Sequence, residues 1–242
     1  MASVGRLAAG VAHEIGNPIT AIMGMHDLLS DKETSEETRI DFLRRMRKET
    51  ERIHFVVRDL LDYARPEGPS SSMSGEASAN VRDVVNDAIA LVRPQKDWKE
   101  IALTNDIDAD IHVFLSPQRL TQIFLNLLLN AAAALGDSPN NAGHAVIVRA
   151  RISGNSRARI EVEDNGPGIP DDLREQIFDP FVTTKDVGKG TGLGLAVCKG
   201  ILESASGRIF VDGAYTRGAR IVLELPARTV CSLALAATPL SD

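Results

Sequence analysis

Apolar residues recur along residues 4–29 at alternating spacings of four and three: Val4, Ala8, Val11, Ile15, Pro18, Ile22, Met25 and Leu29. This pattern predicts a helix whose apolar seam packs in a coiled coil or a helical bundle. A second seam with the same spacings runs from Leu43 to Ala64, and the polar stretch 30–37 separates the two. Two amphipathic helices joined by a short polar loop predict an antiparallel helical hairpin.

A lone hairpin leaves each apolar seam half covered. We therefore expect two copies of the chain to pair as a four-helix bundle, which predicts a homodimer. The alternative is a hairpin that packs on the rest of its own chain. The second helix also carries a run of basic residues, which is typical of a solvated face or of a surface that steers an acidic partner protein: Arg39, Arg44, Arg45, Arg47, Lys48, Arg52 and Arg58.

A boundary follows the hairpin. Residues 66–75 contain two prolines, two glycines and four serines, which is typical of a flexible linker. From residue 80 the pattern becomes a mixture of helix and strand. We therefore expect a hairpin domain at 1–65, a linker at 66–79, a second domain at 80–226 and a tail at 227–242 with no assigned role.

The second domain alternates between two periodicities. Helical spacing predicts helices at 81–93, 117–135 and 193–204, and Ser116 followed by Pro117 is a typical helix start. Strand-like runs occupy 101–107, 111–115, 145–152, 159–163, 209–212 and 219–225. This mixture of helices and mostly antiparallel strands predicts an α/β sandwich with helices on one face of the sheet.

Composition narrows the class of protein. A net charge of -6 argues against a nucleic-acid-binding protein, whose binding surface is basic. The sequence contains no apolar run near the ~18 residues that span a bilayer. Two cysteines are too few for a disulfide framework, so a reducing, cytoplasmic setting is expected.

His13 lies on the first helix, on the side that faces away from the seam. Glu14 follows it directly, and Asn17 lies one turn further along the same helix. Pro18 cannot donate a hydrogen bond to the carbonyl of Glu14, so the helix is weakened just past the histidine. These residues are consistent either with an ordinary surface histidine or with a nucleophile that another group must reach.

Two amides interrupt an apolar helix in the second domain. Asn126 and Asn130 are one turn apart, and amides in such surroundings need partners. They either bond to nearby backbone or offer an oxygen ligand to Mg²⁺, which usually shares its ligands with substrate phosphates.

Two glycine clusters carry the remaining candidate chemistry. Asp164-x-Gly166-x-Gly168 follows a predicted strand, and its carboxylate could accept from an exocyclic amine, although the segment alone is consistent with a tight turn. Gly190-x-Gly192-x-Gly194 leads into a helix, whose N-terminal N–H groups favour anions. The second cluster matches neither a P-loop nor a dinucleotide fingerprint.

The order of these motifs resembles the catalytic domain of sensor histidine kinases. The N, G1, F and G2 boxes of that family correspond to Asn126/Asn130, Asp164-x-Gly166-x-Gly168, Phe178-Asp179-Pro180-Phe181 and Gly190-x-Gly192-x-Gly194. The segment from Ala12 to Pro18 resembles the H-box of the same family. The resemblance covers about residues 3–226, and the nitrogen-regulation-like kinases are the most similar subgroup. It implies a dimeric four-helix bundle followed by a Bergerat-type ATP-binding α/β sandwich.

The resemblance also implies a reaction. His13 becomes the phosphoacceptor in an ATP-dependent autophosphorylation, and the phosphoryl group passes to an aspartate on a response-regulator receiver domain. Glu14 corresponds to the acid/base residue beside the histidine. Asn17 corresponds to the residue that orients water for dephosphorylation of the partner, so phosphatase activity toward the receiver domain is a further expectation.

For the cofactors, the resemblance implies that Asn130 holds Mg²⁺ with support from Asn126, and that Asp164 reads the adenine amine. Gly166 and Gly168 shape the base pocket. The remaining ATP contacts lie in a lid, at Lys185, Lys189, Gly190, Thr191, Gly192, Leu193 and Gly194.

Two other functions are alternatives to the kinase. The same nucleotide fold serves ATPases of the gyrase, heat-shock and mismatch-repair type, which place a Glu where Asn126 stands and leave the His13 hairpin unexplained. A non-catalytic dimeric scaffold would bind but not transfer, yet every box is present in the sequence.

Overall fold

The structure is a computed structural model that describes residues 2–30, 34–64, 78–107, 110–136, 143–154, 156–183, 185 and 191–229. The chain divides into two compact units, Met1–Gly68 with Pro170–Gly200 and Pro69–Ile169 with Ile201–Asp242. The expected hairpin domain, 1–65, lies in the first unit. The expected second domain, 80–226, is divided between the two units, because residues 170–200 group with the hairpin.

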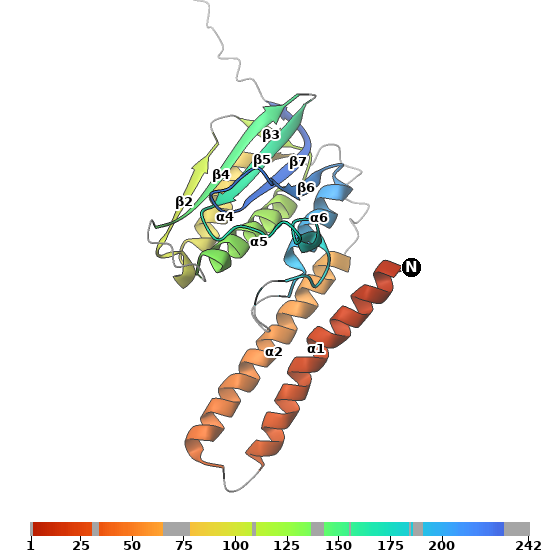
Figure 1. Ribbon diagram of the computed structural model, residues 1–242, viewed down its shortest axis with the longest axis vertical. Helices are drawn as coiled ribbons and strands as arrows, with labels where there is room; N and C mark the ends of the chain where they lie inside the picture. The colour runs from red at the N-terminus through yellow and green to blue at the C-terminus, as the bar shows by residue number, and fades with distance from the viewer. Residues whose placement is uncertain are drawn as a thin grey trace, which may run out of the picture. The chain divides into compact units, whose positions relative to one another are not determined.

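The predicted hairpin is present. Helix α1 spans Ala2–Leu29 and helix α2 spans Glu36–Ala64, and the two pack side by side (Figure 1). Helix α2 begins ahead of its first seam residue, Leu43. The reason is local: the Ser35 hydroxyl accepts a hydrogen bond from the Thr38 N–H at 3.3 Å, and acidic residues in the first turn favour a helix N-terminus.

The second unit is built on a sheet with strand order β1-β3-β7-β5-β4-β2, and β6 pairs with β7 beside this path. Its pairings are antiparallel except that of β2 with β4, which is parallel. The strands are β1 Ala79–Asn80, β2 Ile101–Asp106, β3 Ile111–Val113, β4 His144–Ser153, β5 Arg157–Asp164, β6 Arg208–Val211 and β7 Arg220–Thr229.

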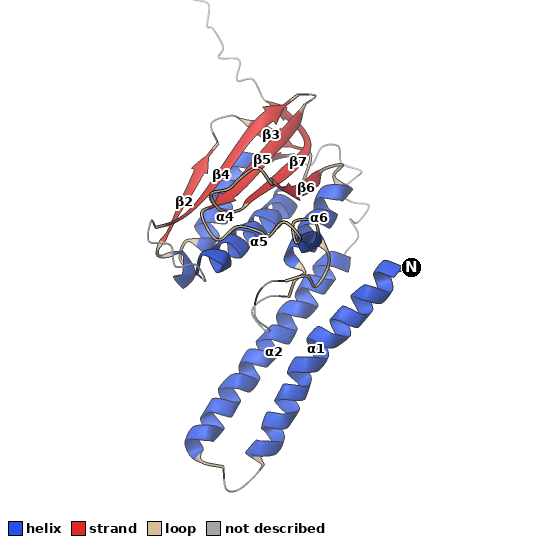
Figure 2. Ribbon diagram, in the orientation of Figure 1, coloured by secondary structure: helices blue, strands red, loops and turns tan. Residues whose placement is uncertain are grey.

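Helices α4 (Val81–Val92) and α5 (Pro117–Gly136) pack against this sheet, so the predicted α/β sandwich is confirmed (Figure 2). Ile160 and Leu223 of the sheet and Phe124 of α5 are fully buried. The remaining elements are α6 (Gly194–Ser204) and two short 3₁₀ helices, Lys96–Trp98 and Gln176–Phe178. Within the residues described here, no helix is long and apolar enough to cross a membrane.

Two strands extend past the domain boundaries that the sequence predicted. The tail was expected to begin at Ala227, but β7 continues to Thr229, because Ile111–Val113 of β3 pairs with Ala227–Thr229. The linker was expected to reach residue 79, but Ala79 is buried and pairs with Val113. Residues 65–77 and 230–242, which hold the rest of the expected linker and tail, lie outside the described part of the chain.

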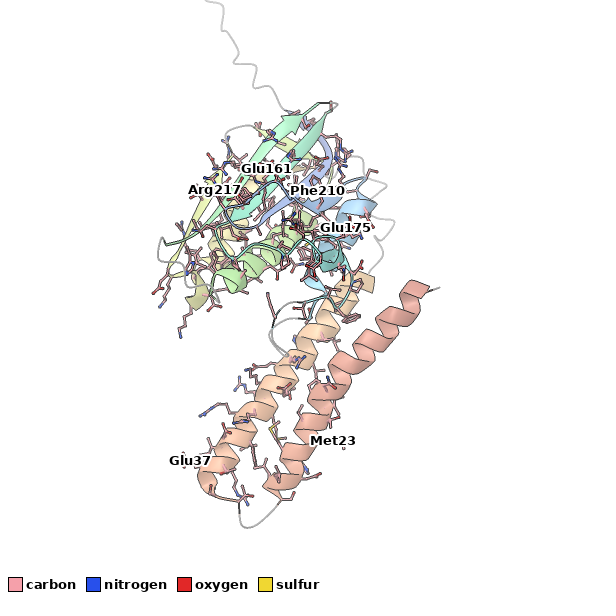
Figure 3. All side chains as sticks on the ribbon, viewed as in Figure 1. Met23, Glu37, Glu161, Glu175, Phe210 and Arg217 are labelled. Carbon is pink, nitrogen blue, oxygen red and sulfur yellow. The ribbon has the colours of Figure 1, made fainter. Side chains whose placement is uncertain are left out.

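The sheet face that bears the β5 carboxylates Glu161 and Glu163 carries a lattice of ion pairs. Figure 3 labels Glu161, which lies on β5, and Phe210, which lies on β6. Arg159 Nε contacts Glu161 Oε1 at 2.6 Å. Glu163 contacts Arg149 Nη1 at 2.7 Å and Arg220 Nε at 3.1 Å. These contacts explain how two carboxylates lose nearly all solvent exposure on a strand whose alternate residues form the core.

Candidate functional site

The predicted phosphoacceptor region lies in the middle of α1. Residues 13 and 14 have helical backbone, but the side chains of His13 and Glu14 lie outside the described part of the structure. Helix α1 continues through Pro18, which is buried, and the Thr20 hydroxyl donates to the Gly16 carbonyl at 2.9 Å. Asn17 is exposed on the same helix. The position of Asn17 therefore allows access from solvent.

The two predicted amides lie on α5. The helix starts as expected, with Pro117 as its first residue and the Ser116 hydroxyl accepting from the Arg119 N–H at 3.4 Å. Asn126 and Asn130 are half-buried, and their neighbours Leu127 and Leu128 are buried. Both amides therefore lie at the edge of the core and stay partly exposed.

Asp164 ends β5, and its carboxylate is held by backbone. Its Oδ1 accepts from the Gly166 N–H at 2.9 Å and from the Ala219 N–H at 3.1 Å. Burial raises the pKa of Asp164, and the two hydrogen bonds oppose that rise. Within the described residues, no hydrogen bond reaches the second oxygen, Oδ2. The arrangement fixes the carboxylate plane and leaves one acceptor for a ligand.

The sequence prediction missed Ala219 and the role of Gly218 as parts of this site. A Cβ on Gly218 would lie 2.0 Å from the carbonyl oxygen of Asp164, so only glycine lets the two backbones meet here. Gly166 and Gly168 lie in the same unit as Asp164, and Gly168 packs beside Gly218. The glycine before the last strand was a signal in the sequence, but its partner could not be read from spacing alone.

The second glycine cluster belongs to the other unit. The Phe181 N–H donates to the Gly192 carbonyl at 3.0 Å, and a Cβ on Gly192 would lie 2.6 Å from the Phe181 backbone. Gly192 also has a φ of +65°, which glycine adopts readily. The Thr191 hydroxyl accepts from the Leu193 N–H at 3.3 Å, just before α6 begins at Gly194.

The predicted lid residues are only partly described. The backbone N–H of Lys185 donates to the Thr183 hydroxyl at 3.1 Å, and its side chain is half-buried. Lys189 and Gly190 lie outside the described residues. The structure therefore brings Asp164, Gly166 and Gly168 together in one unit and places Lys185 with Thr191–Gly194 in the other.

The side chains near the site limit which metal ion could bind. Among the described residues, no group of three or more His, Cys, Asp and Glu side chains could hold a metal. A half-buried amide such as Asn130 can supply one oxygen ligand, and a ligand phosphate can supply others. These residues therefore fit a Mg²⁺ ion that binds together with a phosphate-bearing ligand.

Two known families match this chain. Residues 3–69 match the family described as the His Kinase A (phospho-acceptor) domain. Residues 116–229 match the family described as Histidine kinase-, DNA gyrase B-, and HSP90-like ATPase. The two matches follow the order of the hairpin and the sheet in the structure.

Similar curated proteins include the sensor histidine kinase ZraS of Salmonella typhi, 35% identical over 93% of this chain and 46% of the relative. AtoS of Escherichia coli, a signal transduction histidine-protein kinase, is 34% identical over 93% of this chain and 35% of its own length. The chain thus spans about half the length, or less, of the curated relatives it matches.

Solved structures with a similar fold include the histidine kinase ThkA in complex with the response regulator protein TrrA, with a TM-score of 0.70 and 26% identity over 93% of this chain and 62% of that one. Full-length ShkA in complex with AMPPNP has a TM-score of 0.61 and 25% identity, over 94% of this chain and 47% of that one.

Proposed function

This chain belongs to the sensor histidine kinases of two-component systems, and we propose that it phosphorylates its own His13 from ATP and passes the phosphoryl group to a response-regulator receiver domain. The observation that carries the proposal is the combination, on one chain, of a phospho-acceptor hairpin and a sheet whose Asp164 carboxylate is held with one oxygen left for a ligand. The finer placement among nitrogen-regulation-like kinases stays a prediction.

In the proposed first step, a ring nitrogen of His13 attacks the γ-phosphorus of ATP, the bond from that phosphorus to the β,γ-bridging oxygen breaks, and ADP leaves. Glu14 accepts from the other ring nitrogen, which keeps the attacking lone pair free. Adjacent helix residues do not face each other, so this contact requires the Glu14 side chain to lie along the helix surface. The reaction otherwise needs mainly positioning and neutralisation of charge.

In the proposed nucleotide site, Asp164 accepts a hydrogen bond from the exocyclic amine of adenine, and Gly166 and Gly168 let the backbone approach the ring. Asn130, supported by Asn126, would hold Mg²⁺, which neutralises phosphate charge when bound. The proposed phosphate contacts come from the lid, at Lys185, Lys189, Gly190, Thr191, Gly192, Leu193 and Gly194. Asn126 and Asn130 are both half-buried, which supports the proposed Mg²⁺ site.

In the proposed second step, the phosphoryl group passes from the His13 nitrogen to a carboxylate oxygen of the receiver aspartate. Asn17 is exposed, which suits the proposed role in orienting water for removal of that phosphoryl group. The kinase ThkA was solved in complex with a response regulator protein, and a partner of the same class is proposed for this chain.

We further propose a homodimer formed through the hairpin. Exposed apolar side chains on both helices support it: Ile19, Met23 and Leu28 on α1, and Ile40, Leu43, Val57 and Leu61 on α2. Four helices around one core would cover these side chains. The proposed functional boundaries are a hairpin at 1–65, a linker at 66–78 and an ATP-binding domain from 79 to the end of β7 at Thr229.

Incubation of the purified chain with γ-labelled ATP and Mg²⁺ tests the proposal, with His13→Ala as control. The kinase predicts protein-bound label that is stable in base, labile in acid and absent from the variant. Phosphate release without protein-bound label would indicate an ATPase instead. No nucleotide binding at all would indicate a scaffold.

A further inference from the structure

The turn between β6 and β7 forms one wall of the Asp164 site. Asp164 N–H donates to the Ala219 carbonyl at 2.9 Å, and Ala219 N–H donates to Asp164 Oδ1 at 3.1 Å. Gly218, at the same turn, packs its backbone on the Asp164 carbonyl so closely that no Cβ fits. The orientation of the Asp164 carboxylate therefore depends on where this turn lies.

Arg220, the residue after Ala219, connects the turn to the ion pairs on the charged face of the sheet. It is the register partner of Glu163, the residue before Asp164. Its Nε contacts Glu163 Oε1 at 3.1 Å, and its Nη1 contacts Asp212 Oδ2 at 2.9 Å. The Tyr215 ring lies 4.2 Å from its guanidinium carbon. One guanidinium thus joins the end of β5, the start of the turn and the middle of the turn.

Asp212, which pairs with Arg220, also accepts the hydrogen bonds within the turn. The Asp212 Oδ1 accepts from the Ala214 N–H at 3.1 Å, and the Asp212 carbonyl accepts from the Tyr215 N–H at 3.2 Å. The hydrogen bond from Arg220 lowers the pKa of Asp212, which keeps this carboxylate ionised and paired. Without the guanidinium, Asp212 and Glu163 would each lose a partner. The hydrogen bonds between Ala219 and Asp164 would then be the ones that hold this end of the turn on β5, without the side-chain tie from Arg220.

We propose that Arg220, acting through Asp212 and the Gly218–Ala219 backbone, is a positioning residue that sets the selectivity of the nucleotide site for a 6-amino purine. It does so by keeping the Ala219 N–H on Asp164 Oδ1, so that Oδ2 points at the exocyclic amine. This inference rests on the proposed function, in which Asp164 receives the adenine amine.

These contacts on the Asp164 carboxylate should control the selectivity between purine bases more than the affinity for nucleotide. A carboxylate oxygen accepts from a 6-amino group but opposes the 6-oxo group of a hypoxanthine base, which is itself an acceptor. A site built to hydrogen-bond one group discriminates strongly against an analogue that lacks it, provided the polar group is fixed. A carboxylate released from the Ala219 N–H can rotate away from either base, so discrimination falls.

Calorimetric titration of the full chain with ATP and with inosine triphosphate, in Mg²⁺ buffer, tests the proposal. The wild-type chain is expected to prefer ATP by about 100-fold, and Arg220→Gln to reduce that preference by about tenfold. Arg220→Lys keeps the charge but lacks the planar fork that contacts Glu163 and Asp212 together, so it is expected to restore only part of the preference.

A matched control is available in the same lattice. Arg208 of β6 pairs with Glu224 Oε2 at 2.6 Å and lies over the Phe210 ring. Within the described residues, Arg208 forms no hydrogen bond, ion pair or ring contact with residues 212–219. Arg208→Gln therefore removes an arginine from the same face and is expected to leave the ATP preference unchanged. Asp212→Asn is the milder variant, since an amide oxygen still accepts from the Ala214 N–H, and it serves if Arg220→Gln does not fold.

The outcomes separate the proposed function from the positioning role. A wild-type chain that binds neither nucleotide would overturn the proposed function itself. A wild-type chain that prefers ATP, together with Arg220 and Asp212 variants that keep the full preference, would overturn the positioning role alone. Equal loss in Arg220→Gln and Arg208→Gln would also overturn it, because the effect would then belong to general loosening of the sheet.

Discussion

In the hairpin, Met23, Leu43 and Leu61 expose 62%, 57% and 63% of their surface. In the sheet unit, Phe124, Ile160 and Leu223 expose none of theirs. The sheet has helices on one face and ion pairs on the other, so its core is complete within one chain. The hairpin consists of two helices, and Met23, Leu43 and Leu61 stay exposed on them. The comparison shows that the same chain holds one self-sufficient core and one hairpin whose apolar side chains stay exposed, which is where the proposed second copy would pack.

The largest expected effect concerns the complete core. Phe124→Ala should lower the free energy of unfolding of the sheet unit by about 3–5 kcal/mol, because it opens a cavity in a fully packed site. The chain has one tryptophan, Trp98, and it is buried in this unit, so its fluorescence during urea unfolding reports on the sheet directly. Met23→Ala in the hairpin should leave the Trp98 transition in place, and a comparable shift there would contradict the division.

Charged substitutions on the exposed apolar side chains of the hairpin should weaken dimerisation. The double variant Met23→Glu with Leu43→Glu places carboxylates where the second copy would pack. It should weaken the dimer by about 100-fold or more, equivalent to roughly 2.7 kcal/mol. Sedimentation velocity over a range of concentrations measures the effect. Leu91→Glu is the control, because Leu91 is 57% exposed on α4 in the sheet unit, and it should leave the association state unchanged. A monomeric wild-type chain would contradict the account.

The charged face of the sheet should show a smaller effect. Glu163 is 3% exposed between Arg149 and Arg220, and Glu163→Gln leaves both guanidiniums without their shared carboxylate. Because the arginines reach solvent, the expected loss is about 1–3 kcal/mol. The Trp98 transition again gives the measurement. Glu37→Gln on the exposed surface of α2 should have no effect on it, and equal losses would mean that the lattice contributes nothing specific.

The smallest expected effect has the opposite sign. Burial raises the folded-state pKa of Asp164 above its unfolded value, so its ionised form costs stability. This cost is absent below the unfolded pKa of about 3.9 and appears as the pH rises through the folded pKa. Asp164→Asn should therefore stabilise the ligand-free sheet unit at pH 8 by less than about 1 kcal/mol, with the gain vanishing near pH 4. Urea unfolding at both pH values measures it, and a variant less stable than wild type at pH 8 would contradict this sign.

The sequence predicted the helices and strands of both regions better than it predicted which of them would pair. Spacing located α5, its Ser116 cap and the strand that ends at Asp164, because periodicity and capping are local properties. The alternation of Arg159, Glu161 and Glu163 with apolar residues indicated a strand. It could not show that Glu163 would pair with Arg220, because register between distant strands depends on the assembled sheet.

The same limit explains what was missed at the site. Asp164 was identified from its motif, but the Ala219 N–H that holds it comes from a residue 55 positions away. The end of β7 was misplaced because Ala227–Thr229 pairs with the short strand β3, which lies more than 100 residues earlier in the chain. The parallel pairing of β2 with β4 had no local signal either, since a strand reads alike whichever direction its neighbour takes.

We propose that the two regions take part in one reaction, with the nucleophile on the hairpin and the nucleotide on the sheet. The most direct test is mass-spectrometric mapping of the phosphoryl group after incubation with ATP and Mg²⁺. The protein is kept at alkaline pH throughout the mapping. The account predicts phosphate on the imidazole of His13 in the wild-type chain and in Leu91→Glu. It predicts none in His13→Ala and a strongly reduced amount in Asp164→Asn. Phosphate on another residue, or full labelling of His13 in Asp164→Asn, would contradict the claim.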